Sequence, residues 1–183
     1  MLAALKAMPK KSVVLLHPCC HNPTGVDLSK EQWQALVPVI QANELIPFMD
    51  IAYQGFGDSI EDDAYAIRLF ADAGLSFFTS NSFSKNLSYY GERAGGLSAV
   101  CVNAEEAERV LGQLKLTIRK MYSSPAYHVA TITANVVNEA ELRTMWEGEV
   151  TEMRERIKAM RQKLYEVLTA KVPGKDFSYL IKQ

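Results

Sequence analysis

The chain has 183 residues, with 20 Lys and Arg, 21 Asp and Glu and 3 His, so its formal net charge at pH 7 is −1. With 48% hydrophobic and 22% charged residues, its composition is typical of a globular protein and too apolar for a disordered chain. The near-neutral charge without a Lys/Arg cluster gives no electrostatic basis for binding nucleic acid, and every apolar run is far shorter than the about 20 residues of a membrane-spanning helix.

Cysteine usage indicates a reducing compartment. The chain has an odd number of cysteines, and Cys19 and Cys20 are adjacent, which argues against a bridge between them. The residues after Met1 do not have the form of a cleavable signal peptide. These features together predict a cytoplasmic protein.

The first part of the chain predicts a helix, a strand and a second helix. Residues 2–7 form a short helical segment, and residues 13–16 form a β-branched run typical of a buried strand. The turn-forming residues 21–25 follow. A helix capped by Asp27 or Ser29 comes next. Its apolar residues recur at helical spacing and are Trp33, Leu36, Val37 and Ile40.

The middle of the chain continues this alternation of strands and helices. Further strands are predicted at residues 45–49, 75–79 and 97–102, and further helices at residues 62–73 and 105–118. Strands that alternate with helices predict an α/β domain with a largely parallel, buried sheet.

A long apolar stripe near the end of the chain predicts one unusually long helix. Apolar residues step by three or four positions from Leu142 to Leu168, which gives a helix of about 30 residues and about 45 Å. Residues 177–181 then resemble a strand without a partner. Such a helix is suited to connecting two bodies, so we expect a piece of a longer protein.

Polar residues that follow the predicted strands are candidates for a binding site, because ligands of open α/β sheets bind at the carboxyl ends of the strands. Asp50 ends a buried strand, where a carboxylate is costly unless it is paired. It is either the cap of the next turn or a charge held ready for a cationic ligand. Lys85 is either a solvated surface lysine or a desolvated amine that acts as a Schiff-base nucleophile. Arg93 lies near glycines, where guanidinium and backbone could hold a phosphate.

A second cluster carries potential metal ligands. His17, Cys19, Cys20 and His21 lie close together, but zinc sites usually draw on two ligand pairs, and no second pair occurs. Packing is therefore favoured over metal binding, and no metal site is predicted. The sequence also lacks a P-loop, a dinucleotide fingerprint and a nucleophile elbow.

Several segments, taken together, match the pattern of a known family. They are His21-Asn22-Pro23-Thr24-Gly25, Asp50 to Phe56, Ser82 to Asn86 with Gly91-Glu92-Arg93, Ile118-Arg119 with Tyr122 to Pro125, and Trp146 to Arg161. In order and spacing they resemble the class I, fold-type-I aminotransferases that use pyridoxal 5′-phosphate, in the aspartate and aromatic amino-acid (tyrosine) subgroup. The resemblance covers nearly the whole chain.

The resemblance implies a role for each candidate residue. Lys85 would bind pyridoxal phosphate as a Schiff base and then carry a proton between the substrate α-carbon and the cofactor. Asp50 would pair with the pyridinium nitrogen, so that the ring acts as an electron sink. Asn22 and Tyr53 would hydrogen-bond the 3′-oxygen of the cofactor, and Asn22 would also contact the substrate.

The remaining implied roles concern the phosphate and the substrate. Ser82 and Arg93 would bind the cofactor phosphate. Arg119 would reach across the interface of a homodimer to bind the distal carboxylate of a dicarboxylic substrate.

The resemblance also implies a fold and a division into domains. The fold would be the large domain of the fold-type-I transferases, present in part, with a long helix leading into the small domain. Residues 1–140 would form the partial cofactor-binding large domain, residues 141–171 the interdomain helix, and residues 172–183 the start of the small domain.

The expected reaction is ping-pong transfer of an amino group from an aromatic or dicarboxylic L-amino acid to a 2-oxo acid, with 2-oxoglutarate as the expected acceptor. The tyrosine-type subgroup is favoured over the aspartate-preferring one. A truncated, non-catalytic chain of the same fold remains the alternative, because the family's N-terminal phosphate-binding turn and C-terminal substrate arginine have no counterpart here. A lyase or decarboxylase of this fold is disfavoured by Arg119.

Overall fold

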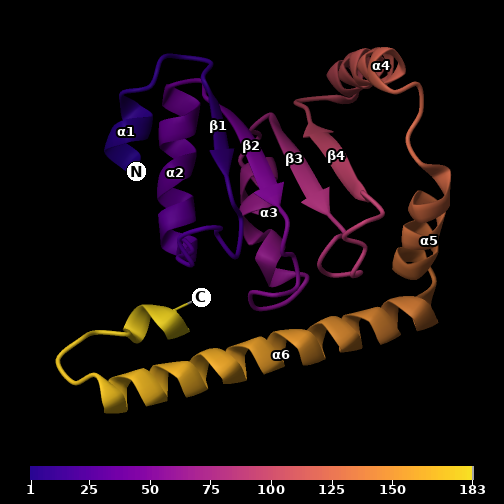
Figure 1. Ribbon diagram of the computed structural model, residues 1–183. Coiled ribbons are helices and arrows are strands. Elements are labelled where there is room, and N and C mark those ends of the chain that lie inside the picture. Colours follow the sequence, from indigo (N-terminus) through magenta and orange to yellow (C-terminus); the bar gives the residue numbers. More distant parts are fainter. Residues whose placement is uncertain (183) are drawn as a thin grey trace.

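The computed structural model describes residues 1–182, which form a sheet flanked by helices (Figure 1). In chain order, with η marking a 3₁₀ helix, the elements are α1 (Leu2–Lys6), β1 (Val13–Leu16), α2 (Lys30–Ala42), β2 (Ile46–Ile51), η1 (Asp62–Ala64), α3 (Tyr65–Asp72), β3 (Phe77–Ser82), β4 (Gly95–Val100), α4 (Ala104–Met121), α5 (Tyr127–Asn138), α6 (Ala140–Lys171) and η2 (Ser178–Ile181).

The sheet has the strand order β1-β2-β3-β4. The first three strands pair in parallel, with Asp50 of β2 opposite Ser80 of β3. Strand β4 is antiparallel to β3, and its Gly95 lies opposite Ser82. The predicted α/β fold with a largely parallel sheet is therefore confirmed, and the three parallel strands end at one edge.

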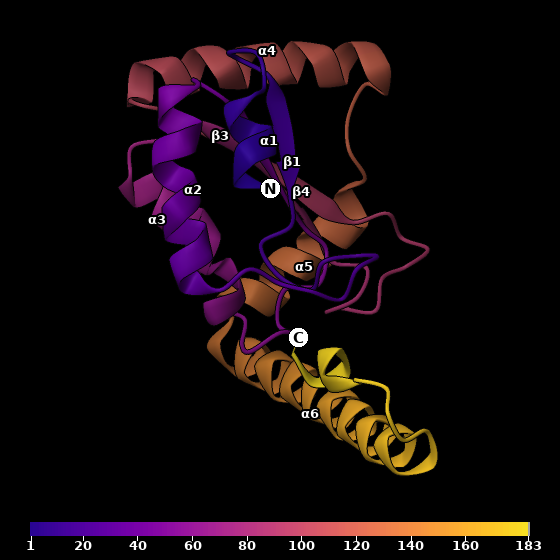
Figure 2. The same cartoon turned by 90° about the vertical axis from the view of Figure 1, so that its left-hand side faces the viewer.

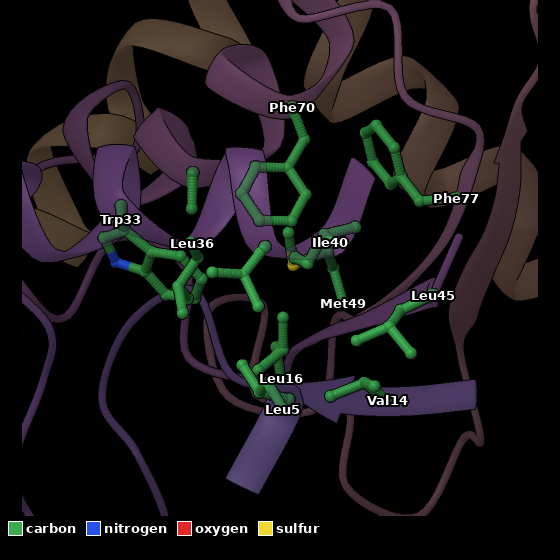
Figure 3. Packing of buried hydrophobic residues seen from close by; sticks show 12 residues of the cluster. Leu5, Val14, Leu16, Trp33, Leu36, Ile40, Leu45, Met49, Phe70 and Phe77 are labelled. Atoms are coloured by element: carbon green, nitrogen blue, oxygen red, sulfur yellow. The ribbon is translucent and has the colours of Figure 1, made fainter. Parts of the chain in front are cut away.

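One face of the sheet carries the hydrophobic core, which packs under α1, α2 and α3 (Figures 2 and 3). Helix α2 begins with a capping box, in which the Ser29 hydroxyl accepts from the Gln32 N–H while the Gln32 side chain accepts from the Ser29 N–H. The aromatic rings of the core meet edge to face, Trp33 with Phe70 at 6.0 Å and Phe70 with Phe77 at 6.2 Å between centroids. The helical spacing read from the sequence therefore identified the buried face of α2.

The opposite face of the sheet is left open by these helices. On β1, Val13 and Leu15 alternate with the buried Val14 and Leu16, and the side chain of Leu15 is 59% exposed. Asp50 has the same strand parity as the half-buried Phe48 and so lies on this open side, away from the core.

Helix α6 has 32 residues, which confirms the predicted long helix. It lies across the carboxyl-terminal ends of β1, β2 and β3, as Figure 1 shows in orange. Within α6 only Val150 and Arg154 are buried, so most of the helix surface is left exposed by the rest of the described chain. Across residues 1–182, no helix combines the length and apolar character that a membrane crossing requires.

The bounds of β2, β3 and β4 differ from the sequence prediction, and β4 begins and ends two residues earlier than the predicted strand 97–102. Strand β2 continues past Met49 to Ile51, because the backbone of Asp50 stays in register with Ser80. Strand β3 begins at Phe77 rather than Leu75 and runs on to Ser82, which pairs with β4. The polar residues therefore extend the strands because backbone pairing does not depend on side-chain polarity.

Two elements near the end of the chain were not predicted correctly. The predicted strand at residues 177–181 is wrong: Ser178–Ile181 form η2, which folds back onto α6, where Arg161 Nε donates to the Leu180 carbonyl at 2.6 Å. Helix α5 was missed because its sequence is rich in β-branched residues and no side chain caps its start at Ala126.

The position of the core generates a stability prediction. Replacing Leu36, which is fully buried, with Ala should lower the free energy of unfolding by about 2–5 kcal/mol, because it leaves a cavity. The matched change Leu15→Ala on the open face should cost about 0.5 kcal/mol or less. Urea unfolding of both variants measures the difference. Equal losses would show that the face bearing Leu15 is covered in solution.

Candidate active site

A pocket of 390 Å³ lies at the carboxyl ends of the parallel strands. Its walls come from the loops after β1, β2 and β3 and from α6. It is lined by Cys20, His21, Asn22, Pro23, Gly25, Tyr53, Phe56, Lys85, Tyr90, Ile157 and Arg161. The fold therefore brings Asn22, Tyr53 and Lys85, which are far apart in the sequence, to a single cavity.

Two of the predicted site residues, Lys85 and Tyr53, contact each other directly. The Lys85 Nζ lies 4.7 Å from the centroid of the Tyr53 ring, within the range of a cation–π contact. Both residues are half-buried. The amine is thus held over an aromatic face and still opens into the pocket.

The loop after β1 is shaped by one carboxylate. The Asp27 carboxylate accepts hydrogen bonds from the backbone N–H groups of Cys20 at 2.6 Å and His21 at 2.8 Å. The ring of His21 is bonded to the Thr24 hydroxyl at 2.7 Å. None of these bonds involves the side chain of Asn22, which is exposed on the pocket wall.

The loop after β2 is held by a buried carboxylate that the sequence analysis did not single out. Asp63 is 6% exposed and accepts from the N–H groups of Gly55 at 2.8 Å, Gly57 at 3.0 Å and Asp58 at 2.8 Å. A Cβ added at Gly57 would lie only 2.5 Å from Asp63 Oδ1. The glycines therefore allow the backbone to wrap around this carboxylate, and the loop keeps Tyr53 in position.

Asp50 lies one strand residue before the end of β2. Its Oδ1 accepts from the Ser80 hydroxyl at 3.3 Å, and the residue is half-buried. Ser80 was missed by the sequence analysis, since only the register of β2 and β3 reveals that it faces Asp50. This long bond leaves acceptor capacity on the carboxylate.

Ser82 and Arg93 flank the loop that carries Lys85. Ser82 pairs with Gly95, and Phe83, which follows β3, donates its N–H to the Ala94 carbonyl at 3.1 Å, directly beside Arg93. The Ser82 oxygen accepts from the Ser84 N–H at 3.1 Å. Arg93 is exposed, has a positive φ of 56°, and donates from Nη1 to the Tyr90 carbonyl at 2.8 Å. The two side chains thus lie at the same end of the sheet as the pocket, although neither lines it.

Arg119 is not brought to the pocket of its own chain. It lies in the last turn of α4, and both views place α4 at the end of the sheet opposite α6 (Figures 1 and 2). Its Nη1 donates to the Ser123 hydroxyl at 2.6 Å. Arg119 therefore does not line the pocket of its own chain.

The cysteine and histidine cluster lies at the pocket, which Cys20 and His21 help to line. The rings of His17 and His21 are tilted by 40° with 4.7 Å between their centroids, and all three cysteines are free thiols. No group of three potential metal ligands occurs in residues 1–182. The neighbouring Cys20 thiol, followed by burial and the carboxylates of Asp63 and Asp27, raises the pKa of Cys19 well above its ordinary value.

The sequence analysis missed several pocket residues. None of Phe56, Tyr90 and Ile157 was assigned a role from the sequence, and Ile157 reaches the wall because α6, distant in the chain, packs against the strand-end loops. A larger cavity of 830 Å³ lies between α2, the η1 region and the second half of α6. None of the predicted site residues lines this larger cavity. The smaller pocket, which Asn22, Tyr53 and Lys85 line, is therefore the candidate active site.

The loop after β2 should depend on the charge state of its carboxylate. Asp63→Asn puts an amide NH₂ where backbone donors converge, and it should lower the free energy of unfolding by about 1–3 kcal/mol. The neighbouring Asp62 is exposed and gives the matched control. Asp62→Asn should change the free energy of unfolding by about 0.5 kcal/mol or less. Urea denaturation of both variants measures this. Similar values for the two would refute the structural role of Asp63.

Stability should also fall at alkaline pH because of Cys19. The folded chain holds the thiol proton above the pH at which the unfolded chain releases it, near the ordinary thiol value of 9.0. The unfolded state is therefore favoured as the pH rises through that value, by at most about 1.4 kcal/mol per pH unit. Urea midpoints from neutral to alkaline pH should fall less steeply for Cys19→Ala than for the parent chain, and parallel slopes would contradict this prediction.

Comparisons with known proteins agree with this geometry. The chain matches the family described as aminotransferase class I and II over residues 1–183. Over the whole chain it is 57% identical to the aromatic-amino-acid aminotransferase of Escherichia coli (strain K12) and 51% identical to an aspartate aminotransferase of Pseudomonas aeruginosa. In both cases it covers 46% of the relative, so it spans less than half the length of these proteins.

Solved structures give the same result. A psychrophilic aromatic amino acid aminotransferase from Psychrobacter sp. B6 is 58% identical, with a TM-score of 0.98, over all of this chain and 46% of that one. An aromatic-amino-acid aminotransferase from Burkholderia pseudomallei, covalently bound to pyridoxal phosphate, is 54% identical with a TM-score of 0.97, again over 100% and 46% of the two chains. The chain therefore belongs to the aminotransferase class I and II family.

Proposed function

We propose that this chain forms the cofactor-binding part of a pyridoxal-phosphate-dependent aminotransferase. The observation that carries the proposal is the Lys85 amine, held 4.7 Å from the centre of the Tyr53 ring in a pocket that Asn22 also lines. Relatives named as aromatic-amino-acid and aspartate aminotransferases support amino-group transfer. The Burkholderia pseudomallei relative, covalently bound to pyridoxal phosphate, supports the cofactor.

The donor and acceptor groups of the site fit this cofactor. The volume of 390 Å³ is in the range of small-molecule sites. Lys85 offers an amine for the cofactor aldehyde. Asp50 keeps acceptor capacity beyond its 3.3 Å bond to Ser80, which suits a protonated ring nitrogen. Ser82 and Arg93 offer a hydroxyl and a guanidinium for the phosphate.

Each residue then has a task in the reaction. Pyridoxal phosphate, when bound, supplies a ring that takes up electrons from the substrate α-carbon. Lys85 holds the cofactor and then moves a proton at Nζ to and from that carbon. Asp50 keeps the ring nitrogen protonated. Tyr53 and Asn22 orient the cofactor through its ring oxygen, and Asn22 on the pocket wall also faces the substrate.

The substrates and the partner follow from the same proposal. The substrates are an aromatic or dicarboxylic L-amino acid and a 2-oxo acid, with 2-oxoglutarate as the acceptor. The partner is a second copy of the chain, because Arg119 lies at the end of the sheet opposite its own pocket and is exposed. In a homodimer it would bind the distal carboxylate of the substrate of the other subunit.

The proposed domain division and location complete this function. Residues 1–140 would belong to the cofactor-binding large domain, residues 141–171 to the interdomain helix and residues 172–183 to the start of the small domain. The extent of α6, Ala140–Lys171, supports this division. Free thiols at Cys19, Cys20 and Cys101 support a reducing, cytoplasmic location.

Covalent capture of the cofactor tests the proposal. The chain is incubated with pyridoxal phosphate, reduced with borohydride to make the attachment irreversible, and digested for peptide mass spectrometry. We expect the adduct on Lys85 at low cofactor concentration, because this amine opens into a pocket. Lys85→Ala should lose that adduct, and Lys115→Ala, which removes an exposed lysine of α4, should keep it. Equal labelling of all lysines would refute the site and favour a non-catalytic scaffold.

A further inference from the structure

We propose that Trp146 and Arg154 of α6 are positioning residues that set the location of Lys85 relative to Tyr53. This inference rests on the proposed function, in which these two side chains form the centre of the site. Helix α6, which is distant in the sequence, contacts both the loop that carries Lys85 and the loop that carries Tyr53.

Helix α6 donates a hydrogen bond to one backbone carbonyl of each loop, in addition to the exposed Lys158–Asp58 contact with the Tyr53 loop at 3.2 Å. Trp146 Nε1 donates to the carbonyl of Asn86, the residue after Lys85, at 2.6 Å. Arg154 Nη1 donates to the carbonyl of Gly55, two residues after Tyr53, at 3.2 Å. Both acceptors are backbone atoms, so each bond fixes the course of a loop rather than one mobile side chain.

The two donors lie on one stripe of the helix. Trp146, Val150 and Arg154 are spaced by four residues, so they project from neighbouring turns, and the donors are about 12 Å apart along the axis. Between them, Val150 is fully buried, and a Cβ added at Gly55 would lie 2.6 Å from its Cγ1. The fit at Gly55 fixes how closely α6 approaches the Tyr53 loop.

The loops contact each other only weakly through the bonds that the structure describes. Asn86 Nδ2 donates to the Gln54 carbonyl at 3.3 Å. The Oδ1 of the same buried amide has no hydrogen-bond partner in residues 1–182. A single long bond is a poor constraint on the separation of the two loops beyond the paired ends of β2 and β3, so the two contacts from α6 add to it.

The burial pattern of α6 supports a positioning role over general packing. Its only buried residues are Val150 and Arg154, and both meet the Tyr53 loop. Arg154 is 9% exposed, and a buried guanidinium is unfavourable unless its donors are used. It bonds Gly55 and, at 3.1 Å, the carboxylate of Glu155. The buried charge thus serves a contact with the backbone of the loop.

The helix also contributes directly to the wall of the pocket. Ile157 and Arg161 lie three and seven residues beyond Arg154 and line the same cavity as Lys85. Movement of α6 against the loops would therefore change both the spacing of Lys85 and Tyr53 and the shape of the pocket.

The test uses the position of the Lys85 amine in the cofactor-free chain. Reductive methylation with ¹³C-formaldehyde gives an NMR signal for each lysine, and Lys85→Arg identifies the signal of Lys85. In the parent chain, that signal should be shifted upfield by the ring current of Tyr53. Tyr53→Leu gives the unshifted position.

Trp146→Phe keeps an aromatic ring but removes the N–H donor, and Arg154→Lys keeps the charge but shortens the reach. Both should move the Lys85 signal most of the way to the Tyr53→Leu position. Arg143→Gln, which breaks an exposed ion pair with Glu147 on the same helix, should leave it unchanged.

An unchanged Lys85 signal in a variant that remains folded overturns the inference, as does loss of the fold in both variants, since the contacts would then serve stability alone. The result is independent of the cofactor. If cofactor capture fails while the Lys85 signal of the two variants moves towards the Tyr53→Leu position, only the proposed function is rejected. If the parent chain captures the cofactor while the folded variants keep the parent's Lys85 signal, only the positioning role is rejected.

Discussion

Parallel pairing of β1, β2 and β3 is the constraint on which the rest of the site depends. Parallel strands run in one direction, so all three carboxyl ends reach the same edge of the sheet. The loops that follow them contain Asn22, Tyr53 and Lys85, and these residues share one pocket. The antiparallel β4 returns the chain beside β3, which brings Arg93 to the same edge as Ser82.

Two carboxylates, the half-buried Asp27 and the buried Asp63, hold the loops at this edge, and the chemically reactive side chains do not. Asp27 and Asp63 accept five backbone N–H bonds between them. A carboxylate satisfied by several donors stabilises a turn without an apolar core. As a result, Lys85 and Asp50 are not needed to hold the loops, and Asn22 remains exposed on the pocket wall. The polar framework thus separates support of the backbone from the groups proposed to bind the cofactor.

Helix α6 adds the second level of organisation. It extends across the edge of the sheet and contacts the loops through Trp146, Val150 and Arg154. Most of its remaining surface, and the face of the sheet that carries Leu15 and Asp50, is not covered by other parts of the described chain. The pocket is therefore assembled at the meeting point of the two most constrained parts of the molecule, the strand ends and the buried stripe of α6.

The sequence by itself determined most element types, the α/β class, the long helix and the residues at the strand ends, because periodicity and turn-forming residues are local properties. The resemblance added a role for each of those residues. Only the tertiary structure decided that Ser80 faces Asp50, that Asp63 holds the Tyr53 loop, that Ser178–Ile181 form a turn of helix rather than a strand, and that α6 bonds both loops. These contacts join residues through strand register, backbone carbonyls and long-range packing, and none of the three leaves a local pattern in the sequence.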